Sequence, residues 1–339
     1  MQKRTFLTIT VFCIELFYPV LWAEKRQKKV FDYQKGAITY SFSGGRFGDN
    51  TIAYYHAKWA SFVSGLPLLY KQFKRSDELM MHELEIAIES VDISKFRRIV
   101  TLKKGDSLEK IKRNSGILYI IPYFPECLQE HECGEPAYLY FKVDWENPLF
   151  KQQIITAMTP REPIQLLKLP ENVLTVGIHI RYNSNGFDPP LLDEVKTSPH
   201  PIPGVYSDVG APLKHVPLRY YVRQLQRILQ LYPVGPVYVY ILTDDLDPAR
   251  FVKLFKESIS DLRVIYDYRK DYNAHTVNIV EDFHNMTLFD CFIRTESNIG
   301  IAASKIAHYK TLIYPVHHYW EGNNLIIDKV QVNEQVFDN

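Results

Sequence analysis

The chain has 339 residues, 46% hydrophobic and 14% aromatic, so it can bury one large core or two ordinary ones and is not a disordered protein. Its 40 basic and 39 acidic side chains leave a formal net charge of +1, which gives no overall field for recruiting nucleic acid or an acidic polymer. A nucleic-acid-binding function is therefore disfavoured.

Residues 1–23 have the pattern of a targeting segment. Two basic residues precede a mostly apolar run from Phe6 to Trp22. The run is shorter than a typical membrane span of about 20 residues and contains Glu15 and Pro19, which favours a cleaved signal peptide over a membrane anchor. A basic cluster at residues 25–29 would hold the next domain on the cytoplasmic side if the segment stays in the membrane. The sequence predicts export or membrane attachment and leaves the membrane face open.

The first half of the chain alternates predicted strands and helices. In chain order we expect a strand at 37–42, a glycine turn at 44–50, a helix at 52–69 with a strand starting near Pro67, surface helices over 76–114 and a buried strand at 116–122. Such alternation is typical of an α/β fold with parallel sheets.

A proline-bounded segment from Pro160 to Pro170 separates this half from a second one with the same pattern. We expect strands at 173–180, 237–242, 263–266 and 292–294, and helices at 218–231, 248–258, 279–291 and 299–309. The predicted organisation is therefore two Rossmann-like domains, at residues 30–165 and 171–325, that face a cleft. In open sheets of this kind, ligands bind at the carboxyl ends of the strands.

Three loops lie at such carboxyl ends. The first contains Gly45 and Gly48 and leads into a helix, so its backbone amides and the helix N-terminus suit a phosphate. Glycine turns between a strand and a helix are also common without any ligand.

The second loop follows the strand at 173–180. His179 and Arg181 share one face of that strand, because side chains alternate along it. An arginine here can pair with a phosphate and stabilise the charge on a departing nucleotide. The alternative is a buried histidine with all its partners and an arginine that caps an acidic surface.

The third loop is Thr243-Asp244-Asp245, after the strand at 237–242. A carboxylate here could accept hydrogen bonds from a guanine edge or from ribose hydroxyls. Asp247 precedes Pro248 and reads as a helix N-cap. Asp245 and Asp247 also spell the acid-x-acid pattern of metal-dependent glycosyltransferases, which is weak evidence as a single triplet.

The four cysteines show no zinc-binding spacing. Cys127 and Cys133 flank a short polar loop and would suit a disulfide if the domain is exported, although a reduced pair is equally acceptable. Cys291 falls in a predicted helix. The sequon at Asn285 lies in the same predicted helix and reads as a chance match.

In chain order, several motifs resemble those of the α-1,2-fucosyltransferases and their relatives, the α-1,6- and protein O-fucosyltransferases. Residues 45–50 (GRFGDN) resemble the family's GRFGNQ or GGLGNQ opening, and residues 177–181 (GIHIR) are similar to its HxRR motif. Residues 217–221 (PLRYY), 243–245 (TDD), 282–288 (DFHNMTL) and 297–298 (SN) resemble later motifs. The resemblance spans roughly residues 37–309, with the separate motifs in the family's order.

The resemblance implies two Rossmann-like domains, GDP-fucose as donor, inversion at the sugar carbon and no obligatory metal. It implies that Arg181 binds the β-phosphate and that His179, with Asp244 or Asp245, reads guanine. Catalysis is assigned to Arg181, and the residues predicted to bind the donor are Gly45, Arg46, Phe47, Gly48, Asn50, His179, Arg181, Thr243, Asp244, Asp245, Ser297 and Asn298.

The chain departs from the family pattern at Tyr182, which stands where the second arginine of the motif is usual, and in an apparent insertion over 186–217. A tyrosine brings no positive charge, so charge stabilisation would fall mainly on Arg181. The leading hypothesis is transfer of fucose from GDP-fucose to a glycan or protein hydroxyl. The alternatives are an inactive glycan- or nucleotide-binding protein and a metal-dependent transferase that uses another sugar nucleotide. Asp49 and His284 are candidates for the general base.

Overall fold

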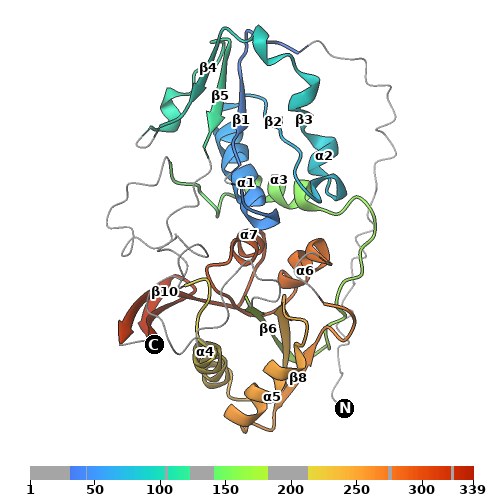
Figure 1. Ribbon diagram of the computed structural model, residues 1–339, viewed down its shortest axis with the longest axis vertical. Coiled ribbons are helices and arrows are strands. Elements are labelled where there is room, and N and C mark those ends of the chain that lie inside the picture. Colours follow the sequence, from blue (N-terminus) through green and yellow to red (C-terminus); the bar gives the residue numbers. More distant parts are fainter. Residues whose placement is uncertain are drawn as a thin grey trace, which may run out of the picture. The chain divides into compact units, whose positions relative to one another are not determined.

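The computed structural model describes residues 31–42, 44–103, 106–122, 141–181, 213–273, 277–321 and 324–339. Tyr33–Asn339 make up one compact unit with parallel sheets and helices, so the predicted α/β class is confirmed (Figure 1). The targeting segment, Cys127, Cys133 and Tyr182 lie outside the described residues. In the described part of the chain, no helix has the length and apolar character needed to cross a membrane.

The first sheet has three parallel strands in the order β1-β5-β4, with β1 at Ala37–Tyr40, β5 at Ile117–Ile121 and β4 at Arg98–Thr101. A two-stranded parallel ladder pairs β2 (Leu69–Tyr70) with β3 (Ile86–Ala87). Helix α1 (Phe47–Ser64) starts five residues before the predicted position, because Phe47, Gly48 and Asp49 already form its first turn. It ends at Gly65, whose φ of 67° suits a glycine helix cap.

The predicted surface helices over 76–114 are wrong. This segment contains short 3-10 turns at Ser76–Glu78, Ile88–Ser90, Ile93–Lys95 and Leu108–Lys110, one short helix α2 (Met81–Leu84), and strands β3 and β4. The β-branched run Ile99-Val100-Thr101 favours a strand, which the charged residues around it obscured. Helix α3 (Pro148–Met158) was not predicted. Asn147 is its N-cap residue, and the Asn147 side chain accepts a hydrogen bond from the Phe150 amide at 3.1 Å.

The second sheet has seven strands in the order β12-β11-β10-β9-β6-β7-β8. Strands β10, β9, β6, β7 and β8 are mutually parallel, and β11 and β12 extend the sheet in antiparallel fashion. The strand bounds are β6 Leu174–Ile180, β7 Val237–Thr243, β8 Val264–Tyr268, β9 Cys291–Ile293, β10 Thr311–Glu321, β11 Asn324–Val332 and β12 Gln335–Asp338. The antiparallel extension was not predicted, and the sheet continues past Leu325. The division into two Rossmann-like domains stays a prediction.

Helices pack on both faces of this sheet (Figure 1). Helices α4 (Leu218–Leu231) and α5 (Ala249–Ser258) pack on the face that carries Val176, Ile178 and Ile180. Helices α6 (Ile279–Met286) and α7 (Asn298–Ile306) pack on the other face and share a core with helix α1. Helix α6 is shorter than predicted, and Cys291 lies in strand β9 rather than in that helix. Side chains alternate along β6, so His179 points toward the face of α6 and α7.

Candidate functional site

The carboxyl ends of three neighbouring strands bring the predicted polar residues to one edge of the second sheet. Strand β6 lies between β9 and β7, with Ile178 opposite Ile293 and Ile180 opposite Thr243. Arg181 therefore leaves β6 beside the point where Asp244 leaves β7. The structure thus brings two of the three sequence-predicted loops together.

Arg181 and Asp244 form a buried ion pair. The Nη1 atom of Arg181 donates to Oδ2 of Asp244, and their side chains are only 7% and 11% exposed. A hydrogen bond between a guanidinium and a carboxylate is stronger than one between neutral groups, because both partners are charged and the buried surroundings screen them weakly. The pair therefore concentrates two opposite charges where three strands end.

His179 is buried against the start of helix α7. It is 5% exposed, and a Cβ atom placed on Gly300 would lie 3.0 Å from its Nδ1 atom. The pKa of His179 is lowered to about 4, mainly by burial; Asp244 opposes this shift, and the nearby Arg181 and Arg294 contribute to it. His179 is therefore a neutral imidazole near neutral pH.

The glycine turn before α1 contacts the same end of α7. A Cβ atom at Gly48 would lie 2.4 Å from the backbone nitrogen of Ile299, so only glycine permits this approach of two helix starts. The side chain of Asp49 joins the two segments: Oδ2 accepts the Arg46 amide at 3.0 Å, and Oδ1 accepts Nδ2 of Asn298 at 2.8 Å. The first predicted loop thus reaches His179 through the first turn of α7.

The remaining residues of the glycine turn differ in exposure. Arg46 is exposed, whereas Phe47 is buried in edge-to-face contact with Phe73 and Phe283. Asn50 is 9% exposed, and its Oδ1 atom has no hydrogen-bond partner among the described residues. Ser297 is 4% exposed and lies at the N-cap position of α7.

The third predicted loop divides into two parts. Asp245 is 5% exposed and supports helix α5: Oδ1 accepts the Asp247 amide at 2.6 Å, and Oδ2 pairs with Arg250 at 2.7 Å. Burial raises the pKa of Asp245, although the Asp247 amide and Arg250 oppose that effect. The Oγ1 atom of Thr243 accepts the Asp245 amide at 3.2 Å. Thr243 and Asp245 therefore shape the loop, and Asp244 is the residue that reaches Arg181.

The two candidates for the general base lie in different places. Asp49 belongs to the glycine turn, as described above. His284 contacts the backbone of Met158 on α3, and burial lowers its pKa to about 4. The adjacent Asn285 is 2% exposed and accepts the Leu167 amide at 2.9 Å, so His284 and Asn285 hold the segment between the two sheets. A buried Asn285 is also consistent with reading its sequon as chance.

Sequence reasoning missed a buried ion pair between Arg294 and Glu296. Arg294 is 2% exposed, its Nη1 atom lies 2.9 Å from Oε1 of Glu296, and its guanidinium lies 4.0 Å from the ring centre of Tyr314. Tyr220 on α4 donates to the carbonyl of Arg294 at 3.0 Å. An arginine at the end of a predicted buried strand was a visible signal, because charged groups are rarely buried without partners.

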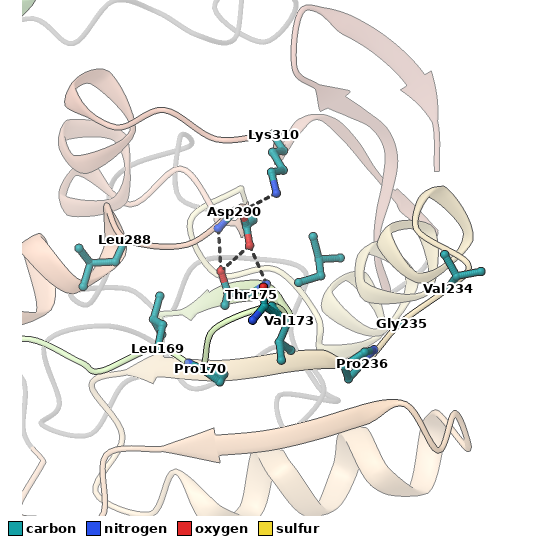
Figure 2. A pocket seen from close by; sticks show the side chains of 12 residues that line it. Leu169, Pro170, Val173, Thr175, Val234, Gly235, Pro236, Leu288, Asp290 and Lys310 are labelled. Carbon is teal, nitrogen blue, oxygen red and sulfur yellow. Dashed lines mark hydrogen bonds and ion pairs between the residues drawn. The ribbon is translucent and has the colours of Figure 1, made fainter. Parts of the chain in front are cut away.

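A cavity of about 530 Å³ lies at the opposite, amino end of the second sheet. Figure 2 shows its lining, with Asp290 between Thr175 and Lys310. The carboxylate of Asp290 accepts the Thr175 amide at 3.0 Å and the Thr175 hydroxyl at 2.9 Å, and it pairs with Lys310 at 2.8 Å. None of the predicted site residues lines this cavity. In the described ranges, no three His, Cys, Asp or Glu side chains are arranged to hold a metal ion.

Comparison with known proteins gave structural matches alone. No family model matches the chain, and no curated protein matches it. Similar solved structures include POFUT1 in complex with GDP-fucose, with 9% identity, TM-score 0.41 and coverage of 82% of this chain and 95% of that one. A mutant of Arabidopsis thaliana FUT1 in complex with GDP has 12% identity, TM-score 0.42 and coverage of 82% and 70%. Fucosyltransferase NodZ from Bradyrhizobium has 10% identity, TM-score 0.37 and coverage of 90% and 99%. Similarity at this level does not establish a family.

Proposed function

We propose that this protein is a glycosyltransferase that takes fucose from GDP-fucose and transfers it, with inversion, to a glycan or protein hydroxyl. The observation that carries the proposal is the meeting of separate motifs at the start of α7. Gly48 packs on the backbone of Ile299, Gly300 packs on His179, and Arg181 follows two residues later. Motifs that resemble those of fucosyltransferases in sequence therefore converge in space.

The arrangement suits a nucleoside diphosphate. Helices α1 and α7 both begin here, and helix starts carry unbonded N–H groups and a partial positive charge that favour phosphate. The guanidinium of Arg181 adds a full charge that would stabilise the departing diphosphate as an acceptor hydroxyl attacks the sugar carbon. Binding of the diphosphate would then replace Asp244 as the main partner of Arg181.

For recognition of the base we propose His179 and Asp244. Asp244 is better placed than Asp245, because both oxygens of Asp245 already hold helix α5. A metal-dependent transferase that uses Asp245 and Asp247 would have to break the Asp245–Arg250 contact, so the geometry favours the metal-independent reaction.

We further propose that residues 1–23 direct export or attach the protein to a membrane. Protease protection of tagged protein in intact vesicles tests this proposal.

A thermal-shift panel with GDP, UDP, CMP and their sugars tests the proposed donor. Only a nucleotide bound by the folded state raises Tm. A nucleotide present at 100 times its Kd stabilises the folded state by about 2.7 kcal/mol. We expect GDP and GDP-fucose to raise Tm, and UDP and CMP to have little effect. A shift with UDP alone would overturn the proposed donor. Binding of GDP without consumption of GDP-fucose across a panel of acceptors would instead identify an inactive binding protein.

A further inference from the structure

The Nδ1 atom of His179 lies in a buried, electropositive environment. The histidine is 5% exposed, and Nδ1 has no hydrogen-bond partner among the described residues. It faces the Cα atom of Gly300, the third residue of helix α7, so close that an added Cβ would lie 3.0 Å away. The first turn of a helix carries N–H groups without intrahelical partners, which produce a positive potential.

Two arginines add to this potential. Arg294 contacts the same turn, because a Cβ on Gly300 would lie 3.5 Å from its Cβ and 3.6 Å from its Cδ. Arg181 lies just beyond the end of strand β6, two residues after His179, and its charge acts on the imidazole; Asp244 is the acidic group that opposes it. Glu296 and Tyr314 fix the guanidinium of Arg294, so its charge is held in one place.

We propose that His179 carries its single proton on Nε2 and keeps the lone pair of Nδ1 toward helix α7, and that Arg294 is a positioning residue that holds this tautomer. A proton on Nδ1 would point a donor at Gly300, where no acceptor lies within the described structure, and toward positive charge. An unsatisfied buried donor costs about 1–3 kcal/mol, and the positive charge of Arg294 adds to this preference for one tautomer. A helix N-terminus can keep an imidazole neutral in the same way.

This tautomer defines what His179 offers to a ligand. An Nε2–H group is a donor, and the edge of guanine presents the O6 and N7 acceptors, whereas adenine presents an amino donor in place of O6. The tautomer would therefore favour GDP over ADP. This consequence rests on the proposed function, but the tautomer itself does not.

Nitrogen NMR of the full chain with ¹⁵N-labelled histidine tests the tautomer without any ligand. The resonances of His179 are assigned through bonds from the backbone, and the expected pattern at pH 7 is one protonated Nε2 and one unprotonated Nδ1. A protonated Nδ1, or protons on both nitrogens, would overturn the proposal.

Three variants test the part played by Arg294. The double variant Arg294→Met with Glu296→Gln removes the charge without leaving an unpaired buried carboxylate, and we expect it to populate the Nδ1–H form. Glu296→Gln alone and Arg294→Lys retain the positive charge and are expected to keep the wild-type pattern. If the double variant also keeps that pattern, Arg294 does not position His179.

A matched pair of amide substitutions tests whether Nε2 of His179 donates a hydrogen bond to GDP. The amide nitrogen of glutamine occupies the place of Nε2, and that of asparagine occupies the place of Nδ1. We expect His179→Gln to bind GDP within about threefold of wild type and His179→Asn to bind at least about tenfold more weakly, in line with an unmade hydrogen bond. The reverse order, or equal losses, would contradict an Nε2 donor. Failure of the wild type to bind GDP would refute the proposed function, while the NMR result would still decide the tautomer.

Discussion

The two ends of the second sheet differ in whether their buried polar groups have hydrogen-bond partners. At the amino end, both oxygens of Asp290 have partners, and its contacts with Lys310 and Thr175 lower its pKa although burial acts to raise it. At the carboxyl end, Nδ1 of His179 is buried without a hydrogen-bond partner in the described structure, and burial is the main cause of its low pKa. The cavity of about 530 Å³ lies at the amino end, whereas the carboxyl end has the incomplete polar contact of His179.

This difference indicates where a ligand adds most. The Arg181–Asp244 pair at the carboxyl end holds charged groups that a diphosphate and a base could engage, whereas the completed network around Asp290 gains little from a new partner. Substitutions at the carboxyl end should therefore alter binding and turnover, and those at the amino end should alter folding stability alone.

The largest effect is expected from Arg181→Met. Loss of one positioned charge should lower turnover of GDP-fucose by about 10²–10³-fold, measured with saturating donor. The matched control is Arg250→Met, which breaks the neighbouring pair with Asp245 and should keep most of the activity. Full turnover by Arg181→Met, with a folded protein confirmed by its Tm, would remove Arg181 from the mechanism.

Gly48→Ala should give the next largest effect. The new methyl group would lie 2.4 Å from the Ile299 nitrogen and 2.7 Å from the Asn298 carbonyl carbon, both backbone atoms that cannot move aside alone. We expect a loss of about 3 kcal/mol in the free energy of unfolding by urea, at the upper end for overpacking. In Gly300→Ala the methyl group would meet the His179 side chain at 3.0 Å, so a loss of about 1 kcal/mol is expected. Equal losses would show that α1 and α7 are not held this closely.

These positions also show what the sequence could reveal. The α/β class and several elements of the second sheet followed from periodicity, because long apolar strands and amphipathic helices such as α4 have strong local patterns. The segment 76–114 was assigned wrongly because its short strands and turns depend on pairing with β5 and β2. Local pattern carries little information about such pairing.

The candidate site was predictable in part for a related reason. The rule that ligands bind at carboxyl ends of parallel strands pointed to His179, Arg181 and Asp244 from the sequence alone. It could not separate Asp244 from Asp245, since that depends on Arg250 and the start of α5. Nor could it reveal that Gly48 contacts the start of α7 or that Gly300 contacts His179, because such contacts join residues far apart in the chain.

At the amino end, Asp290→Asn should reduce stability without altering GDP affinity. The pKa of Asp290 is lowered in the folded state, so its stabilising contribution is present above the ordinary carboxyl pKa of about 3.9 and is lost as pH falls below it. We expect a loss of about 1.5 kcal/mol at pH 7 that shrinks toward pH 3, measured by urea unfolding. A change in GDP affinity at pH 7 would contradict the division of roles between the two ends.

The smallest effect is expected from Asn298→Ala, which removes the 2.8 Å hydrogen bond to Asp49. A single hydrogen bond of this kind contributes about 1 kcal/mol, so stability should fall by no more than that. Because the bond joins the glycine turn to the start of α7, GDP affinity should also weaken, by about threefold. Ser304→Ala is the control, since it removes a 2.7 Å bond to Ile301 within the same helix and leaves the two turns joined. If both variants lose equal stability and only Asn298→Ala loses GDP affinity, the two turns act together on the ligand. If neither variant loses GDP affinity, the Asp49–Asn298 contact contributes to folding alone.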